Sequence, residues 1–497
     1  MNKIGKFLLS SVLAVSTMLS MVACNTGSGS SQSSGGGDST TNSSTNDNPV
    51  IDKDNIVKPV KTADVTDYNG SAVTIQFYHS MGANLRGVVS KWIAEFNKQY
   101  PNITIEGLST SWGDYDGLKT QISTEITAGN SPHIAFCYPD HVAHYNLAGK
   151  VVCLDNYIMD DTMGLTETEL YDFVPAFYNE GKVYGSDKMY TLPFAKSTEV
   201  MYYNKTYFEK NHLTVPTTWD EMENVCKQII DIEKGKGNTD VIPLGYDSEA
   251  NWFITMCEQL NQPYTSATGD HFVFDTAENR AFVERFTSWH KKGYVTTQEI
   301  NGSYTSDLFT NQTAFMCIGS SAGASYQKAD VVEGEGGGYQ FEVGVATPPQ
   351  ANANNKKVIS QGPSLVMFKK NNEQEVAATW LLMKFLTTKV ELQAEYSMTS
   401  GYMPVIKTAQ SHEVYQEFLA KADGGAYLQA ACVKQSIAQM DYYYVSPAFD
   451  GSSAARDAVG TLIQACFVNA PSDAAGIKTY VANKFEETVE ELEMDYS

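Results

Sequence analysis

The sequence is poor in basic residues. Its 497 residues include 35 Lys and Arg against 58 Asp and Glu, which gives a formal net charge of -23 at pH 7. Proteins that bind nucleic acid need a basic surface to contact the phosphates, so this balance argues against nucleic acid as a partner. The acidic excess mainly favours solubility and does not select any particular ligand.

The sequence also lacks paired cysteine motifs. None of its eight cysteines forms a C-x-x-C pair or shows zinc-like spacing. Apart from Cys24, seven cysteines are scattered in apolar contexts, at positions 137, 153, 226, 257, 317, 432 and 466. We expect them to be small buried side chains. One disulfide is possible, but the spacing of the cysteines does not show which two would form it.

The apolar run from Phe7 to Val22 is short for a membrane span, which takes about 20 apolar residues. Two lysines precede it, which is typical of a secretory signal, here over residues 1–23. A small residue directly before Cys24, followed by a Ser/Gly tract, resembles the bacterial lipoprotein signal, in which this cysteine carries the lipid. An ordinary signal peptide cut elsewhere is the alternative. Residues 24–69 are rich in Ser, Gly and Thr and are expected to form a flexible tether.

Strand and helix patterns alternate between Val73 and Phe136. Val73–Tyr78 alternates as a strand does, and apolar residues at helical spacing follow up to Phe96. A second strand, a second helix closed by Gly129, and a third strand complete a βαβ pattern. The pattern predicts an α/β fold whose ligand site lies outside the carboxyl ends of the strands. The chain is too long for one ordinary core, so we expect two or more lobes.

Large aromatic residues at these strand ends are candidate ligand platforms. A sugar presents apolar C–H faces and a rim of hydroxyls, so its site combines aromatic rings with paired donors and acceptors. Trp112 and Tyr115 lie in a polar loop, and Trp252 starts a predicted helix; packing inside a lobe is the alternative for each. Asp140 could accept sugar hydroxyls or cap the helix that follows it.

Two further motifs suggest chemistry. His141 and His144 are one helical turn apart, but no acidic or His-rich loop accompanies them, so no metal is expected. Gly319-Ser320-Ser321-Ala322-Gly323 matches the G-x-S-x-G pattern of hydrolases, with Ser321 as the nucleophile. A hydrolase of this kind also needs an acid and a histidine after the nucleophile. One histidine, His412, follows Ser321, and the sequence singles out no acidic residue as the third member.

Several segments together resemble the extracellular solute-binding proteins of carbohydrate ABC importers, the maltose-binding-protein-like family. They follow the family order over nearly all of the chain after Val73. They are Phe77-Tyr78-His79-Ser80-Met81-Gly82, Thr127-Ala128-Gly129-Asn130-Ser131-Pro132-His133-Ile134, Leu192-Pro193-Phe194, Met201-Tyr202-Tyr203-Asn204-Lys205, Pro216-Thr217-Thr218-Trp219-Asp220-Glu221, Ala314-Phe315-Met316 and Thr399-Ser400-Gly401-Tyr402-Met403-Pro404.

The resemblance implies a type II periplasmic-binding-protein fold, with two hinge-linked α/β lobes and a ligand cleft between them. The expected first lobe comprises residues 70–194 and 317–362, and the second comprises 198–313 and 367–497. Crossing segments are expected near Phe194–Ser197, Phe315–Ser320 and Gly362–Met367.

The opening motif and the Tyr115 region are most similar to the sn-glycerol-3-phosphate-binding members. Matching their motifs gives a candidate site made of Tyr115, Asp140 (where they carry Glu), Ser197, Ser320 or Ser321, Gly362 and Tyr402. Those members hold the phosphate with an arginine in a C-terminal loop. No arginine matches here, and Arg456 is the nearest one. A neutral sugar or oligosaccharide is therefore the expected ligand.

The resulting hypothesis is a monomeric, non-enzymatic, cofactor-free receptor. It would be held on the outer face of the cell membrane by a lipid on Cys24 and would deliver a carbohydrate to the membrane subunits of an ABC permease. Binding of a glycerol-3-phosphate-type polyol phosphate is one alternative. A secreted hydrolase, acting on esters through Ser321 or on glycosides through a carboxylate pair, is the other. Turnover discriminates between a receptor and a hydrolase, because a receptor leaves its ligand intact.

Overall fold

The computed structural model describes residues 51–184, 188–332, 338–446 and 448–496. The expected signal peptide, Cys24 and residues 25–50 of the expected tether lie outside the described residues. The prediction of a flexible tether is wrong for residues 51–69, because Ile56, Val65 and Tyr68 pack on the first lobe and the backbone N–H of Thr62 donates to Oδ1 of Asn156 at 2.8 Å. Within the described ranges, no helix has both the length and the apolar character needed to cross a membrane. The seven cysteines from Cys137 to Cys466 all carry free thiols.

The first lobe is built on a five-stranded sheet with the order β2-β1-β3-β13-β4. β1 pairs in parallel with β2 and β3, and β13 is antiparallel to β3 and β4. Its strands are β1 (Val73–Tyr78), β2 (Ile103–Glu106), β3 (Ile134–Cys137), β4 (Thr191–Pro193) and β13 (Ser364–Met367). Its helices are α1 (Ala83–Gln99), α2 (Tyr115–Ala128), α3 (Pro139–Leu147), α4 (Asp155–Ile158), α5 (Glu167–Asp172), α6 (Pro175–Asn179), η1 (Glu180–Lys182), α13 (Glu373–Thr388), α14 (Val390–Ser400), α15 (Lys407–Gln410) and α16 (Glu413–Ala420).

The second lobe is built on a seven-stranded sheet with the order β14-β12-β5-β8-β6-β7, in which β11 also pairs with β5. Its strands are β5 (Ser197–Asn204), β6 (Leu244–Tyr246), β7 (Val295–Thr297), β8 (Met316–Ser320), β11 (Val343–Ala346), β12 (Val358–Gln361) and β14 (Tyr443–Tyr444). Its helices are α7 (Lys205–Lys210), α8 (Trp219–Gly235), α9 (Glu249–Leu260), α10 (Ala277–Lys291), α11 (Gln298–Asn301), α12 (Ser306–Thr310), α18 (Ser452–Asn469) and α19 (Ala474–Tyr496).

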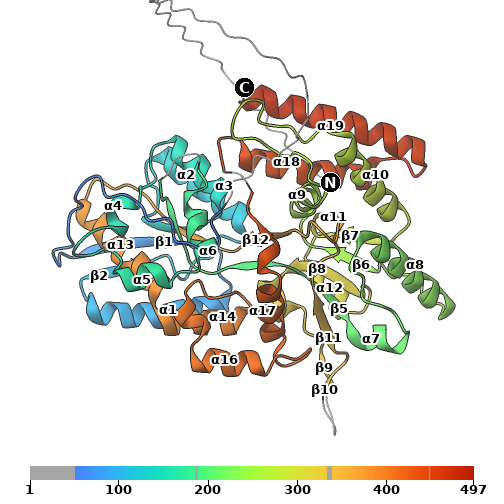
Figure 1. The fold of residues 1–497 in the computed structure, drawn as a ribbon, viewed down its shortest axis with the longest axis horizontal. Coiled ribbons are helices and arrows are strands. Elements are labelled where there is room, and N and C mark those ends of the chain that lie inside the picture. Colours follow the sequence, from blue (N-terminus) through green and yellow to red (C-terminus); the bar gives the residue numbers. More distant parts are fainter. Residues whose placement is uncertain (1–50, 185–187, 333–337, 447, 497) are drawn as a thin grey trace, which may run out of the picture. The chain divides into compact units, whose positions relative to one another are not determined.

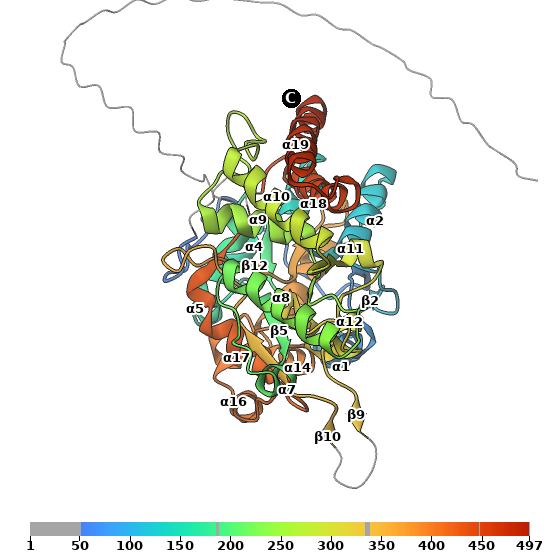
Figure 2. The ribbon, with the colours of Figure 1, turned by 90° about the vertical axis from the view of Figure 1, so that its right-hand side faces the viewer.

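The remaining elements are η2 (Ser321–Tyr326), the strands β9 (Val331–Val332) and β10 (Gly338–Tyr339), α17 (Leu428–Ala438) and η3 (Met440–Tyr442). Of these, η2 and α17 contact β5, and β9 and β10 pair with each other in a separate two-stranded sheet. Elements of the first sheet lie on the left of Figure 1 and those of the second sheet on the right. Figure 2 shows α18 beside α19 at the C-terminal end of the chain, with α10 next to them, as their contacts require.

The local patterns of the sequence form the elements they predict. In α1, one face is buried and comprises Val88, Val89, Ile93 and Phe96. α2 ends at Gly129, which adopts the left-handed conformation (φ 79°) that glycine accepts readily. α8 begins with a capping box, in which Thr218 and Glu221 satisfy each other's backbone N–H groups. The predicted α/β fold and its opening βαβ unit are confirmed.

The strand pairing divides the chain differently from the expected assignment. Residues 317–362 were assigned to the first lobe, yet β8, β11 and β12 all pair with β5 in the second sheet. Residues 367–497 were assigned to the second lobe, yet Trp380 and Leu392 are buried in the first lobe's core. Motif order along a chain does not reveal which sheet a strand joins, because that depends on long-range pairing.

In the described residues the chain crosses between the lobes three times: the first two crossing segments are closely apposed, and the third lies between α16 and β14. β4 leads into β5 through residues 194–196, and β12 leads into β13 through Gly362 and Pro363. The backbone N–H groups of Phe194 and Ala195 both donate to the carbonyl of Pro363, at 3.0 and 3.2 Å. Gly362 has φ +105°, and a Cβ there would lie 2.5 Å from the carbonyl oxygen of Ala195. Only glycine allows this approach. The crossing expected at 315–320 is instead the interior strand β8.

Candidate functional site

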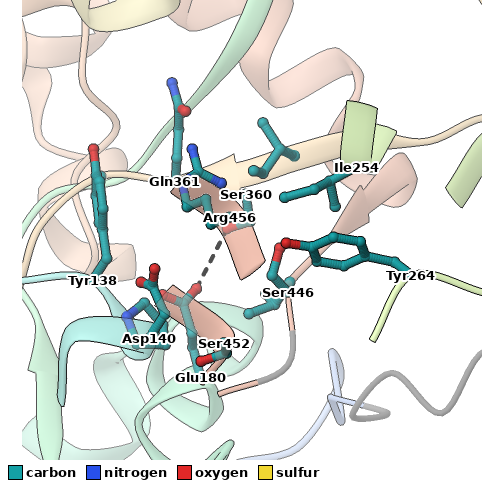
Figure 3. Close-up of a pocket in the computed structure, with 14 residues that line it drawn as sticks. Tyr138, Asp140, Glu180, Ile254, Tyr264, Ser360, Gln361, Ser446, Ser452 and Arg456 are labelled. Carbon is teal, nitrogen blue, oxygen red and sulfur yellow. Dashed lines mark hydrogen bonds between the residues drawn. The ribbon is translucent and has the colours of Figure 1, made fainter. Parts of the chain in front are cut away.

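A cavity of about 50 Å³ lies where the two lobes meet (Figure 3). The first lobe contributes the start of α3, directly after β3, and the segment η1. The second contributes β12, α9 and α18. The cavity therefore lies at the carboxyl end of β3, as the βαβ pattern predicts. The lining residues are Tyr138, Pro139, Asp140, Glu180, Ile254, Tyr264, Ile359, Ser360, Gln361, Gly362, Val445, Ser446, Ser452 and Arg456.

Two tyrosines and two carboxylates give the cavity its chemical character. Tyr138 and Tyr264 stand on opposite sides of the view in Figure 3. Asp140 and Glu180 lie together below them, and the hydroxyl of Ser360 donates to Oε2 of Glu180 at 3.5 Å. Within the described residues, Oδ2 of Asp140 is buried without a hydrogen-bond partner. A buried carboxylate oxygen with no partner is an acceptor that a ligand hydroxyl can satisfy.

Arg456 supplies a guanidinium group to the same cavity. It lies in the first turns of α18, and its Nη2 donates to Oδ1 of Asn251. Burial opposes its charge, but the nearby carboxylate of Asp140 and the tyrosines raise the pKa of Arg456 overall. The cavity therefore contains an arginine, although motif matching had assigned no role to Arg456.

The sequence did carry a signal for Arg456. That signal was scarcity alone, because the chain has only four arginines. The structure then shows that Arg280 and Arg285 pair with carboxylates on the second lobe and that Arg86 binds the carbonyl of Ser109. Glu180 gave no such signal, because nothing in the sequence distinguishes it from the other 57 acidic residues. Tyr138 directly precedes Asp140's helix at the end of β3, so strand-end reasoning could have included it.

Tyr115 lies in an aromatic group next to the cavity. Its ring stacks on Tyr138 with centroids 4.2 Å apart. Burial raises the pKa of Tyr402 to about 12, which a hydrogen bond to Tyr115 partly offsets. Trp112 does not line the cavity but packs on Tyr78, with centroids 5.2 Å apart. The structure thus joins Tyr115, Tyr138 and Tyr402 into one face and leaves Trp112 beside it.

The structure places Trp252 in the core of the second lobe. Its side chain has no exposed surface and stacks on Tyr246 (centroids 4.7 Å apart), with Trp219 and Phe286 also in contact. A side chain in this position cannot face the cavity, so the proposal of Trp252 as a ligand platform is wrong. A tryptophan that faces a ligand and a tryptophan that packs in the core would give the same apolar pattern at the start of this helix. Only the tertiary packing distinguishes the two positions.

The candidate serines lie near the crossing segments rather than on the cavity wall. Ser197 is buried, and the hydroxyl of Ser320 donates to its Oγ at 3.5 Å. Ser321 is also fully buried, and its Oγ accepts the backbone N–H of Thr198 at 3.3 Å. A hydrolase nucleophile sits exposed on a sharp turn, so the surroundings of Ser321 differ from that arrangement.

Metal ligands do not assemble around the H-x-x-H motif in the described part of the chain. His141 is buried in α3 and its ring lies against Tyr138, with centroids 5.4 Å apart. The described residues contain no group of three or more His, Cys, Asp or Glu side chains that could hold a metal ion.

Comparison with known families identifies the chain. The family model described as "Bacterial extracellular solute-binding protein" matches residues 91–423. The chain belongs to this family. The match covers most of the first lobe, part of the second lobe and the two apposed crossing segments, and it ends before β14, α18 and α19. Arg456 lies beyond its end, so the family match alone gives this residue no role.

Curated and solved relatives support the same assignment. The chain is 23% identical over 373 residues to the sn-glycerol-3-phosphate-binding periplasmic protein UgpB of Escherichia coli K12, covering 72% of this chain and 80% of that protein. The structure is similar to that of UgpB from Mycobacterium tuberculosis in complex with glycerophosphocholine, with a TM-score of 0.67 and 15% identity over 85% of this chain and 99% of that one. It is equally similar to the Listeria monocytogenes ABC substrate-binding protein Lmo0181 in complex with cycloalternan, with a TM-score of 0.68 and 16% identity over 85% and 100%. These likenesses confirm the two-lobed binding-protein fold.

Proposed function

We propose that this protein is a receptor that captures a carbohydrate between its lobes and delivers it to an ABC permease in the membrane. The observation that carries the proposal is the interlobe cavity, which combines tyrosine rings with the acceptors Asp140 and Glu180 and the donor Arg456. Rings pack on the C–H faces of a sugar, and carboxylates accept its hydroxyls. Relatives named for maltotriose and cycloalternan support the same ligand class.

The size of the cavity supports a hinge movement. Sites for small molecules usually measure about 300–1,000 Å³, whereas this cavity measures about 50 Å³. A sugar therefore fits this cavity only if the cavity widens, as it would when the lobes separate. We infer that the lobes rotate about residues 194–196 and Gly362–Pro363 and close on the ligand.

We propose that the ligand contacts the cavity residues Tyr138, Asp140, Glu180, Gly362 and Arg456. It would also contact the neighbouring candidates Trp112, Tyr115, Ser197, Ser320, Ser321 and Tyr402. The tyrosines around Tyr115 would supply the stacking face. The serines and Gly362 lie at the crossing segments, where opening of the lobes would expose them.

Binding of a phosphate-bearing polyol is a second candidate, and Arg456 is the observation that favours it. A guanidinium group is suited to the oxygens of a phosphate. Relatives named for sn-glycerol 3-phosphate and glycerophosphocholine bear on the same candidate. Asp140 opposes a phosphate at this position, because its carboxylate repels the ligand's negative charge.

A titration panel distinguishes these candidates. Residues 50–497 would be titrated calorimetrically with maltotriose, glycerol 3-phosphate and glycerophosphocholine. Binding of maltotriose alone supports the carbohydrate receptor, and binding of the two phosphate compounds supports the second candidate. Recovery of the ligand unchanged after incubation excludes turnover. Release of product, abolished by Ser321→Ala, would instead establish a hydrolase.

We propose further that the receptor is monomeric and is anchored through a lipid on Cys24. Residues 51–69 contact the first lobe, so only the chain before them could act as a tether. A flexible chain from residue 25 to 50 would span about 28 Å on average, using roughly 5–6 Å times the square root of its length. Such a tether would hold the lobes just off the membrane surface. Cys24→Ser should move the protein from the membrane fraction to the soluble fraction. A variant that still sediments with membranes would contradict the anchor, and light scattering of residues 50–497 tests the monomer.

A further inference from the structure

A carboxyl group stands directly behind the arginine of the cavity. Arg456 donates to Oδ1 of Asn251, and Nδ2 of Asn251 donates to Oε1 of Glu199 at 2.8 Å. The same Nδ2 also donates to Oε1 of Gln361 at 3.1 Å, and Gln361 lines the cavity. Glu199 itself does not line the cavity but is connected to it through one amide side chain.

This connection orients the amide. An ionised carboxylate can only accept hydrogen bonds, so Asn251 must turn its Nδ2 toward Glu199. Its Oδ1 then faces Arg456, which can only donate. The carboxylate of Glu199 thus fixes the acceptor that holds the guanidinium group at the cavity wall.

Glu199 is buried among groups that respond to its charge. Oε2 of Glu199 accepts the hydroxyl of Tyr246 at 2.6 Å. The other titratable or charged neighbours are Asp247 at the end of β6, Tyr444 on β14 and Arg456 on α18. Burial raises the pKa of Glu199 to about 7, although the bonds from Tyr246 and Asn251 and the charge of Arg456 oppose the shift.

The balance of charge at Arg456 therefore depends on Glu199. Glu180 is already neutralised, because its carboxylate pairs with the buried ammonium of Lys196. Asp140 faces Arg456 from the first lobe and offsets one positive charge. An ionised Glu199 adds a second negative charge behind the arginine, and a protonated one does not.

We propose that Glu199, acting through Asn251, is a specificity-determining residue that sets how strongly Arg456 attracts an anionic group on the ligand. The inference rests on the proposed solute-binding function of the cavity. When Glu199 is protonated, Arg456 is free to attract a phosphate or carboxylate. When Glu199 is ionised, the site favours neutral hydroxylated ligands.

The direct test compares two probes across pH. The phosphodiester of glycerophosphocholine keeps its charge from about pH 5.5 to 8.5, and maltotriose carries none. We expect the affinity for glycerophosphocholine to fall by about fivefold or more over this range, as in a typical coupling between sites. Glu199→Gln should remove this dependence, and the affinity for maltotriose should stay constant.

Glu258→Gln provides a matched control. Burial also raises the pKa of Glu258 to about 7, but the charge that acts on it is Lys357. The control should keep the wild-type pH profile for glycerophosphocholine. Affinities for glycerophosphocholine that do not change with pH, or that change equally in wild type and Glu199→Gln, would overturn the proposal.

A measurement without ligand separates this inference from the proposed function. Failure of both probes to bind would count against the proposed ligands. Titration of the Glu199 carboxyl by NMR would then test the coupling between Glu199 and Arg456 without a ligand. Loss of the arginine in Arg456→Gln should raise the pKa of Glu199, whereas Arg456→Lys, which keeps the charge, should leave it near the wild-type value. The same pKa in all three proteins would overturn the coupling. Circular dichroism confirms that each variant folds. If Arg456→Gln does not fold, the comparison of Arg456→Lys with wild type remains. A pKa of Glu199 that rises in Arg456→Lys as far as expected for complete loss of the positive charge would also overturn the coupling.

Discussion

The ammonium of Lys196 and the carboxylate of Glu180 form an ion pair in which the side chains are 0% and 3% exposed. Lys196 lies in the crossing segment between β4 and β5, where its backbone also pairs with Met403. Glu180 lines the cavity. The pair therefore links this crossing segment to the wall of the cavity. Its two charges compensate each other where both side chains are almost fully buried.

Removing one partner of this pair should be costly. Lys196→Met leaves the carboxylate of Glu180 buried without a counter-charge, and we expect the free energy of unfolding to fall by about 3–5 kcal/mol. Urea denaturation at pH 7 measures the change. The double variant Lys196→Met/Glu180→Gln should recover part of the loss, because it removes both charges.

An exposed pair serves as the control. Lys91 and Glu395 lie 2.7 Å apart, with side chains 58% and 31% exposed. Lys91→Met should change the free energy of unfolding by less than about 1 kcal/mol. Equal losses for Lys91→Met and Lys196→Met would show that the buried pair has no special role in stability.

Trp252 and Tyr115 should respond differently to substitution by alanine. Trp252 is fully buried in an aromatic cluster, so Trp252→Ala should destabilise the fold by about 3–5 kcal/mol. Tyr115 is partly exposed beside the cavity, so Tyr115→Ala should weaken ligand binding by more than it lowers stability. Thermal unfolding and calorimetric titration on the same samples measure both effects. A Tyr115→Ala variant with unchanged affinity would move the ligand away from the tyrosine face.

Much of the first lobe could be predicted from sequence because its signals are local. The alternation in Val73–Tyr78, the helical spacing up to Phe96 and the cap at Gly129 each act within a few residues. The strand-end rule then placed Asp140 and the Tyr115 region near the site. The capping box at Thr218 was equally readable, because it depends on a spacing of three residues.

The rest depended on contacts between distant residues. β13 joins the first sheet although more than 150 residues separate it from β4. No local sequence pattern predicts that these two strands pair. Arg456 reaches the cavity because α18 packs against α9 and α3. The same packing buries Trp252 instead of exposing it. A helix pattern shows that an apolar face exists but does not show which partner covers it.

A contact between the lobes should contribute to closure. Nζ of Lys119 on α2 lies 2.8 Å from Oδ2 of Asp457 and 2.9 Å from Oγ of Ser453, both on α18. We expect Asp457→Asn to weaken ligand binding about two- to fivefold, within the usual contribution of a partly exposed pair. The loss should shrink at high salt, where the pair is screened.

X-ray scattering provides the structural readout for this pair. Asp457→Asn should give a larger radius of gyration without ligand, because one contact that holds the lobes together is lost. Lys484→Gln breaks a pair with Glu487 inside α19 and provides the control, since it leaves the interlobe contact intact. Identical scattering and affinity in Asp457→Asn and wild type would show that closure does not depend on Lys119.

The raised pKa of Glu199 also predicts how stability depends on pH. The carboxyl has a pKa near 4.5 when unfolded and about 7 when folded, chiefly because it is buried. The folded protein therefore binds this proton more tightly than the unfolded chain does. Its contribution to stability is complete below pH 4.5 and is lost as pH rises through 7.

The size of this effect follows from the shift. A difference of about 2.5 pKa units corresponds to roughly 3 kcal/mol. Between pH 4.5 and 8, wild type should therefore lose about that much stability relative to Glu199→Gln, whatever the absolute stability of the variant. Urea denaturation at several pH values measures the two profiles. Parallel profiles would mean that Glu199 is already ionised at pH 5, and Arg456 would then face a permanent counter-charge at every pH at which a ligand binds.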